Sequence, residues 1–262
     1  MLYITFKSTV GKLNAQYHHS KNVNAPVAIV VDSTCTDTDT GKNSFDEATN
    51  AIVDTFIENG FSTLKFNFRK ENETEKNNKK DTDTETNNVL DLTAALDWLH
   101  SKNIESKSYW ICGVDTGALS ALQLVMRRPE IENYILVSPN LKKNDLGFMV
   151  PCVASGLLVR ASEDLRFLEE DCVNLQEKLI TKTESKILYT TIYKADRNYI
   201  TELEQLKSEI DSHIKNKLKE DYQNFKSVSI NKRRRRKKRI HDADEEKIIY
   251  VNPIKSLDID DI

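Results

Sequence analysis

Apolar runs alternate along this chain with segments in which apolar residues recur every three to four positions. The runs at 27–31, 61–68 and 108–112 are rich in β-branched and aromatic residues, which is typical of buried strands. The segments at 44–59 and 90–100 have the periodicity of helices with one apolar face. The alternation of the two kinds of segment predicts an α/β fold with a doubly wound, mainly parallel sheet.

The same patterns predict the remaining elements. Further strands are expected at 2–6, 12–18, 134–137, 156–159 and 187–193, and further helices at 118–125, 165–180 and 200–225. Ser44 and Glu47 have the spacing of a capping box at a helix start, and Gly60 is placed to end that helix. Residues 71–88 are polar, charged and without periodicity, so we expect a long surface loop there.

Composition narrows the class of protein. The chain has 262 residues, of which 39% are hydrophobic, and this is enough for one substantial core. No apolar stretch reaches the roughly 18 residues that span a membrane, and the first residues lack a signal-peptide pattern. The four cysteines are far apart and form no C-x-x-C pair, so neither a zinc site nor a redox motif is indicated. We expect a cytoplasmic protein with no membrane span, no metal and no cofactor.

Charge is distributed unevenly, although the formal net charge is only -3. An unbroken block of cations lies near the C-terminus and consists of Lys232, Arg233, Arg234, Arg235, Arg236, Lys237, Lys238 and Arg239. An acidic stretch at 242–246 follows it. This pattern predicts one domain over residues 1–228 and a charged, flexible tail over 229–262.

The basic block is the strongest indication of a partner. Adjacent cations attract phosphate backbones with an affinity that falls steeply with salt, and they also attract anionic membranes and acidic proteins. No aromatic residue interrupts 233–239, so base stacking is not indicated and nucleic-acid binding would be independent of sequence. RNA, DNA or the ribosome is therefore one hypothesis for the partner. A solvated tail that contacts its own acidic neighbours is the other.

The motif Gly113-Val114-Asp115-Thr116-Gly117 carries the most chemical information. An apolar run precedes it and a helix-forming run follows it, which is the strand, tight turn and helix of a nucleophile elbow. The two glycines permit the sharp turn and the close packing of strand and helix. Asp115 stands at the centre, where a serine hydrolase has its serine.

Five segments of the chain, one of which contains this motif, resemble the α/β hydrolases. The resemblance is in particular to the small bacterial dienelactone-hydrolase-like branch of lidless members. They are Ala28-Ile29-Val30-Val31; Asn59-Gly60-Phe61 leading to Leu64-Lys65-Phe66-Asn67-Phe68-Arg69; Ala94-Ala95-Leu96-Asp97-Trp98-Leu99; Trp110 to Gly117; and Arg127-Arg128-Pro129-Glu130-Ile131 leading to Val137-Ser138-Pro139. The resemblance covers roughly residues 12–199.

The resemblance implies a degenerate catalytic triad. The family order of nucleophile, acid and histidine falls on Asp115, Asp164 and Arg197, so both the serine and the histidine are replaced. The loop after Val31 normally carries His-Pro and glycine residues in this family, but here it reads from Asp32 to Gly41 without His-Pro; the loop after Arg69 normally continues with glycines, but here it reads Lys70-Glu71-Asn72-Glu73. An arginine side chain stays protonated at neutral pH, so Arg197 is expected to form a salt bridge with Asp115 or Asp164 rather than to act as a base.

Three hypotheses for function remain open at this point. The main one is a non-hydrolytic binding or scaffold module. The second is a hydrolase of small ester-like substrates with Asp115 as nucleophile, as in haloalkane dehalogenases and epoxide hydrolases of this fold, whose ester intermediate needs a water activated by histidine. The third is a polyanion binder that acts through the basic block. One alternative gathers Asp32, Asp37 and Asp39 with Asp115 and Asp164 around a hard cation. Their spacing matches no metal loop, so a solvated polar loop is favoured.

Overall fold

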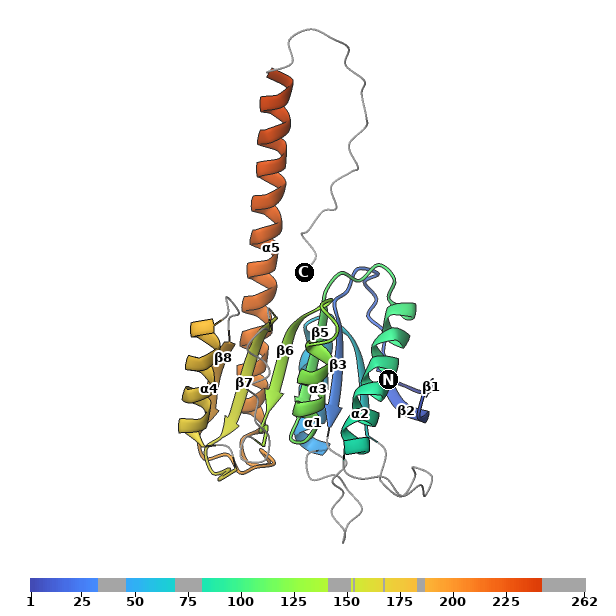
Figure 1. Cartoon of the computed structure of the whole chain (residues 1–262), viewed down its shortest axis with the longest axis vertical. Helices are drawn as coiled ribbons and strands as arrows, with labels where there is room; N and C mark the ends of the chain where they lie inside the picture. The colour runs from blue at the N-terminus through green and yellow to red at the C-terminus, as the bar shows by residue number, and fades with distance from the viewer. Residues whose placement is uncertain are drawn as a thin grey trace. The chain divides into compact units, whose positions relative to one another are not determined.

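The computed structural model describes residues 1–32, 46–68, 82–140, 152, 154–166, 168–182 and 187–241 (Figure 1). At 46, 82–84, 175–176, 178–182 and 224–241 it describes the backbone alone. The chain divides into two compact units, Met1–Lys215 and Asn216–Ile262. The first unit contains the whole sheet.

Eight strands form one sheet. They are β1 (Leu2–Ser8), β2 (Gly11–His18), β3 (Val27–Asp32), β4 (Ser62–Asn67), β5 (Tyr109–Val114), β6 (Ile131–Val137), β7 (Ser155–Ala161) and β8 (Ile187–Ile192). Their order across the sheet is β1-β2-β4-β3-β5-β6-β7-β8. The strands from β4 to β8 are parallel, whereas β1 and β2 form an antiparallel extension at one edge.

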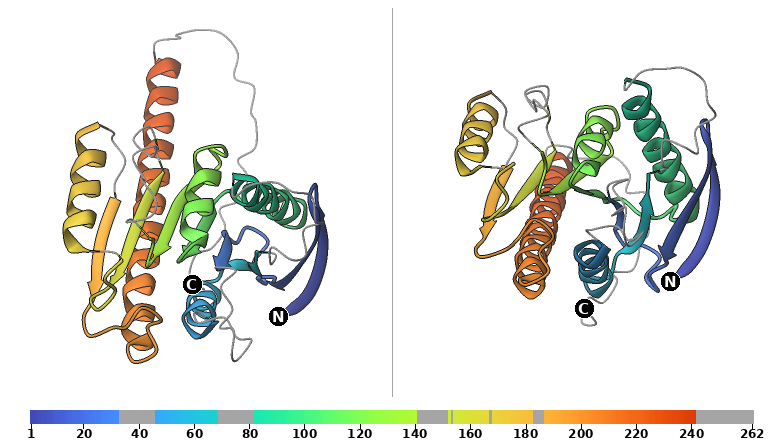
Figure 2. Two further views of the ribbon diagram at one scale, coloured as in Figure 1. Left: turned by 60° about the horizontal axis from the view of Figure 1, so that its bottom comes forward. Right: turned by 90° about the horizontal axis from the view of Figure 1, so that it is seen from below.

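Helices cover both faces of this sheet. They are α1 (Asp46–Glu58), α2 (Thr82–Lys102), α3 (Gly117–Val125), α4 (Glu169–Lys182) and α5 (Leu203–His241). Seen along the sheet, α2, α3 and α4 lie on one face, and α1 and the first part of α5 lie on the other (Figure 2). The predicted α/β class with a doubly wound, mainly parallel sheet is therefore confirmed.

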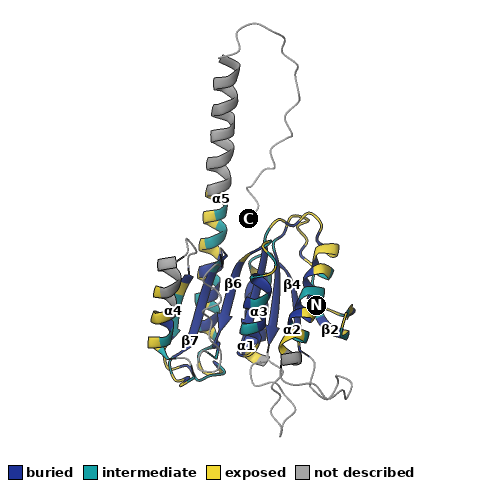
Figure 3. Ribbon diagram, in the orientation of Figure 1, coloured by how far each residue is buried: buried dark blue, intermediate teal, exposed yellow. Residues whose placement is uncertain are grey.

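Burial on both faces explains why the central strands are apolar throughout. All six residues of β3 and all six of β5 are buried (Figure 3). In β5, Ile111 belongs to the core cluster that includes α2 and α3, while Trp110 contacts Phe56 of α1 and His213 of α5. Successive side chains of a strand point to opposite faces, so a strand between two helical layers needs apolar residues at every position.

Gly60 ends α1 as predicted. Its φ is 82°, and the N–H groups of Gly60 and Phe61 donate to the carbonyl oxygens of Ile57 and Phe56. This is the left-handed helix end that glycine favours. The capping box predicted at Ser44 and Glu47 cannot be followed, because Ser44 lies outside the described residues.

Two predicted boundaries are corrected. Helix α2 begins at Thr82, so the predicted loop at 71–88 is wrong for its last residues. The polar sequence from Thr82 to Asn88 gives no apolar periodicity from which a helix start could be predicted. Helix α4 begins at Glu169 rather than at Leu165.

Helix α5 also exceeds its prediction. Its backbone is helical to His241, beyond the expected end at Phe225, so the basic block at 232–239 lies on helical backbone. The boundary between the two compact units falls within this helix, after Lys215, and the predicted domain of residues 1–228 stays a prediction. Lysine and arginine are good helix formers, and no glycine or proline interrupts α5. No helix in the described part of the chain is both long enough and apolar enough to cross a membrane.

Candidate functional site

The elbow motif forms the expected tight turn at the carboxyl end of β5. Asp115 has a φ of 50°, and its N–H donates to the carbonyl oxygen of Val137 at 2.9 Å. Its own carbonyl accepts a hydrogen bond from the N–H of Ala118 at 3.2 Å. A Cβ atom at Gly117 would lie 2.8 Å from the carbonyl oxygen of Val31, so only glycine lets α3 start this close to β3.

The carboxylate of Asp115 is held by two arginines. Its Oδ1 lies 2.9 Å from Nη1 of Arg166, and its Oδ2 lies 3.0 Å from Nη2 of Arg197. The Asp115 side chain is 1% exposed, whereas the arginine side chains are 28% and 40% exposed. The expected contact between Arg197 and Asp115 is therefore present, and each oxygen of the buried carboxylate faces its own guanidinium.

Asp164 lies in the loop after β7 and is held by Arg166 in a fork. Nε and Nη2 of Arg166 donate to Oδ1 and Oδ2 of Asp164 at 3.1 and 2.9 Å, and the backbone N–H of Arg166 donates to Oδ1 at 3.0 Å. Paired contacts of this kind between a guanidinium and a carboxylate are among the stronger hydrogen bonds in proteins. One guanidinium thus bridges Asp164 and Asp115.

The pKa values of Asp164 and Arg166 reflect the charges in this bridge. Burial acts to raise the pKa of Asp164, but hydrogen bonds from Arg166 and the charges of Arg166 and Arg197 outweigh burial, so its pKa lies below the ordinary value. Burial acts to lower the pKa of Arg166, but its two carboxylate partners outweigh burial and raise it. Both groups are therefore charged at neutral pH.

Comparison with known proteins places this geometry in a known fold. No family model matches the chain. The chain is 28% identical to the uncharacterized protein RP471 from Rickettsia prowazekii (strain Madrid E) over 242 residues, which are 91% of this chain and 98% of that protein. The crystal structure of ATU1826, a protein of unknown function from Agrobacterium tumefaciens named there as a candidate α/β hydrolase, matches with a TM-score of 0.72 and 29% identity over 83% of this chain and 97% of that one. The chain is an α/β-hydrolase-fold protein.

More distant α/β-hydrolase structures share the same architecture. XC6422 from Xanthomonas campestris, an α/β serine hydrolase without a lid, matches with a TM-score of 0.65 and 15% identity over 82% of this chain and 94% of that one. Est1E from Butyrivibrio proteoclasticus matches with a TM-score of 0.66 and 15% identity over 82% of this chain and 98% of that one. The predicted resemblance is confirmed for the superfamily, while the narrower dienelactone-hydrolase-like branch stays a prediction.

The α/β-hydrolase positions expected from the sequence lie together. Asp115, Asp164 and Arg197 follow β5, β7 and β8, and these parallel strands end at the same edge of the sheet. The contact with Arg166 was not predicted from the sequence, because the family pattern places the partner of the two acids at the histidine position alone. The sequence feature that could have indicated this contact is the position of Arg166, two residues after Asp164, because a tight loop brings such a pair within reach of each other.

The loop that carries Arg197 is fixed by its neighbours. The Asp196 carboxylate accepts hydrogen bonds from the N–H groups of Asn198 and Ile200, at 3.3 and 2.9 Å. Tyr199 has a φ of 59° and is fully buried. Its hydroxyl lies 2.8 Å from Oγ of Ser138, which follows β6 with a φ of 47°, and donates to the carbonyl oxygen of Val159 at 3.4 Å. Arg197 is therefore presented by a loop tied to β6 and β7.

Removing the hydroxyl of Tyr199 should loosen this loop. We expect Tyr199→Phe to lower the free energy of unfolding by about 1–2 kcal/mol, because the buried Ser138 hydroxyl loses its partner. Urea denaturation measures this loss. In Ser138→Ala with Tyr199→Phe the combined loss should be smaller than the sum of the single losses, since the two groups contact each other. Fully additive losses would contradict the role of this hydrogen bond.

The carboxylates of the loop after β3 can be followed only in part. Asp32 is fully buried and accepts a hydrogen bond from Oγ1 of Thr49 at 2.6 Å. Asp37 and Asp39, the other members of the cation cluster weighed from the sequence, lie outside the described residues. Among the residues that the structure describes, no group of three or more His, Cys, Asp or Glu side chains has the arrangement of a metal site.

The histidines whose side chains are described lie at the opposite end of the sheet from Asp115. The ring centroid of His213 lies 6.1 Å from that of Trp110, and the ring centroid of His100 lies 4.8 Å from that of Tyr109. Tyr109 and Trp110 are the first two residues of β5. His18 pairs in register with Thr63 at the start of β4, and Nδ1 of its neighbour His19 is 2.7 Å from the Tyr17 hydroxyl. Five strand residues from Trp110 to Asp115 span about 17 Å, so none of these imidazoles is placed to act there.

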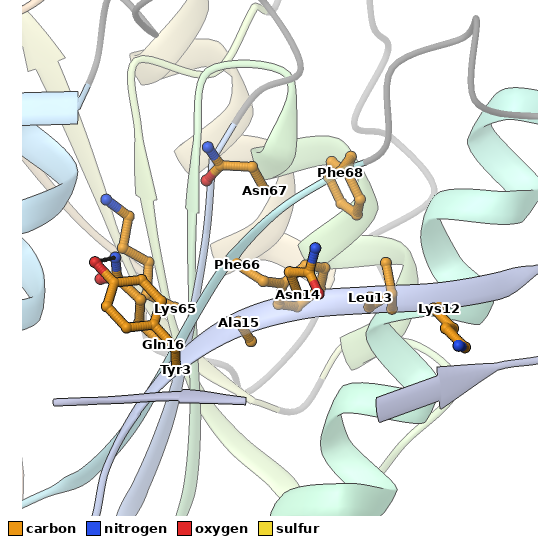
Figure 4. A pocket seen from close by; sticks show the side chains of 10 residues that line it. All are labelled: Tyr3, Lys12, Leu13, Asn14, Ala15, Gln16, Lys65, Phe66, Asn67 and Phe68. Carbon is orange, nitrogen blue, oxygen red and sulfur yellow. Dashed lines mark hydrogen bonds between the residues drawn. The ribbon is translucent and has the colours of Figure 1, made fainter. Parts of the chain in front are cut away.

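A separate hollow of about 380 Å³ lies where β2 diverges from β4 (Figure 4). Its lining combines amides and lysines with apolar groups and consists of Tyr3, Lys12, Leu13, Asn14, Ala15, Gln16, Lys65, Phe66, Asn67 and Phe68. Nζ of Lys65 donates to Asn50 of α1 at 2.7 Å, and Nε2 of Gln16 donates to the Tyr3 hydroxyl at 3.3 Å. Because β3 separates β4 from β5, this hollow is distinct from the charged cluster around Asp115.

Proposed function

We propose that this α/β-hydrolase-fold protein is non-hydrolytic and that its core serves as a binding or scaffold module. The observation that carries the proposal is the double engagement of Asp115, whose two carboxylate oxygens each contact a different guanidinium. The site where the fold normally holds its nucleophile is then a charge-balanced cluster of two carboxylates and two arginines. Such a cluster stabilises the elbow and the neighbouring loops.

The chemistry of the cluster supports this proposal. In a Ser-His-Asp triad the imidazole bridges the nucleophile and the acid, and it accepts a proton from the nucleophile. Here Arg166 bridges Asp115 and Asp164, and a guanidinium has donors only. An ester formed on Asp115 would also need a water activated by a base, and the histidines with described side chains lie at the far end of the sheet.

Hydrolysis of a panel of short-chain aryl esters and lactones tests the proposal. We expect rates at the uncatalysed background for the purified chain and for Asp115→Asn alike. Asp54→Asn is the matched control, because it makes the same change at an exposed position of α1. A rate above background that Asp115→Asn abolishes and Asp54→Asn preserves would overturn the proposal and make Asp115 the nucleophile of a family hydrolase.

A further inference from the structure

The basic block at 232–239 lies on the helical backbone of α5. A helix rises about 1.5 Å per residue, so the eight cations of the block are spread over about 12 Å of helix axis. An extended chain would spread the same charges over more than twice that length. The fold of α5 therefore concentrates the charge that the sequence supplies.

This charge density matches that of a nucleic-acid duplex. One cation per about 1.5 Å along the helix compares with one phosphate charge per about 1.7 Å along double-stranded DNA. An α-helix with its side chains is about 10–12 Å wide, and the major groove of DNA is about 12 Å wide. A helix of this kind can therefore lie along the groove between two phosphate backbones.

We propose that the basic block of α5 binds the phosphate backbones of double-helical nucleic acid without preference for base sequence. Eight consecutive cations present nearly the same charge when the helix shifts by one residue, so no single register on the bases is favoured. Phosphate contacts position a protein on a duplex but carry no sequence information. The inference is independent of what the Asp115 cluster does.

An anionic membrane is the competing surface, and the sequence of the helix disfavours it. Helices that lie in a membrane surface insert an apolar face beneath the headgroups. Residues 231–239 contain no apolar side chain, so this part of α5 has no such face. Phosphates that line a groove match this segment better than a lipid interior does.

Fluorescence anisotropy with labelled 25-base-pair duplexes tests the proposal on the full chain. The variant replaces Arg233, Arg234, Arg235, Arg236 and Lys237 with glutamine, which keeps helix propensity and removes five charges. We expect it to bind at least about 100-fold more weakly at 100 mM salt. The slope of log K against log salt should become shallower by about 0.9 for each removed cation that contacts a phosphate, which is at most about 4.5 for the five.

The control and the competing ligands make the result decisive. The control replaces five exposed lysines of the first unit with glutamine, namely Lys7, Lys12, Lys21, Lys102 and Lys107, and it should keep its affinity within about threefold. DNA and RNA duplexes of the same sequence identify which nucleic acid is bound more tightly. Equal loss in both variants, no loss in the first, or binding to phosphatidylserine vesicles without binding to either duplex would overturn the proposal.

Discussion

Replacing Arg166 with methionine should lower the free energy of unfolding at pH 7 by about 3–5 kcal/mol, the usual cost of removing one partner from a buried ion pair. Arg166 supplies three hydrogen bonds to Asp164, two of them from its guanidinium, and one to Asp115. Methionine keeps most of the length of the side chain but removes the guanidinium, so that of the ion pairs described for the two buried carboxylates only the contact of Asp115 with Arg197 remains. Urea denaturation, with its slope compared to that of the wild type, measures the loss.

Two further substitutions show whether this loss is specific to the bridge. Arg127→Met removes an exposed arginine and should change stability by less than about 0.5 kcal/mol. Arg197→Met should cost less than Arg166→Met, because Asp115 keeps Arg166 and Asp164 keeps all its hydrogen bonds. If Arg166→Met were no more destabilising than Arg127→Met, the cluster would not be a source of stability.

The same substitution should reverse a pH dependence. The folded-state pKa of Asp164 lies below its ordinary value, so its stabilising contribution is present above the unfolded pKa of about 3.9 and is lost as pH falls through the lowered folded pKa. Without Arg166, a buried carboxyl favours protonation. The variant should therefore be most destabilised at neutral pH, and it should approach the wild type between pH 5 and pH 3 in the same urea assay.

The cluster also gives a physical reason why an aspartate at the expected nucleophile position would be accompanied by an arginine at the expected histidine position. A buried carboxylate without partners is costly, so an aspartate at the elbow requires a cation within reach. Arg197, where the resemblance leads us to expect the histidine, meets this requirement for one oxygen of Asp115, and Arg166 meets it for the other. A histidine would serve only while protonated, whereas arginine is always charged at neutral pH.

The sequence predicted the central strands and the elbow well, because both depend on strong local constraints. A strand buried on both faces needs an unbroken apolar run, as in β3, and a sharp turn from strand to helix needs the glycines at 113 and 117. Helix ends were predicted less well. The first turns of α2 are polar and mostly weak helix formers, whereas the last turns of α5 are mostly lysine and arginine; neither segment has an apolar periodicity to detect.

The candidate site could be predicted only in part, because some of its contacts depend on loop paths and backbone angles. The contact of Arg197 with Asp115 followed from family positions, but the bridge by Arg166 depends on the path of one loop after β7. The contact between Ser138 and Tyr199 joins residues 61 positions apart, and both adopt a positive φ without being glycine. Neither the loop path nor such backbone angles are marked by residue type in a single sequence.

The second large effect is expected at the elbow itself, where Gly113→Ala should destabilise the fold by about 3 kcal/mol. A Cβ atom at this position would lie 2.6 Å from Cα of Ala118 and 2.8 Å from the carbonyl oxygen of Gly117. Both contacts are with backbone atoms, so β5 or the start of α3 must move to relieve them. Such a movement would also shift Asp115, which lies between these two elements.

Gly60→Ala is the matched control. It adds the same methyl group at a position that has room for it but a backbone conformation that disfavours it. At Gly60 no atom lies within 4 Å of the added Cβ, but the φ of 82° disfavours any side chain. We expect a loss of about 1 kcal/mol there, from the left-handed backbone alone. Urea denaturation of the two variants in parallel separates crowding from backbone strain. A smaller loss for Gly113→Ala than for Gly60→Ala would show that the elbow has room to adjust, and that its glycine spacing is not required for the close packing of α3 on β5.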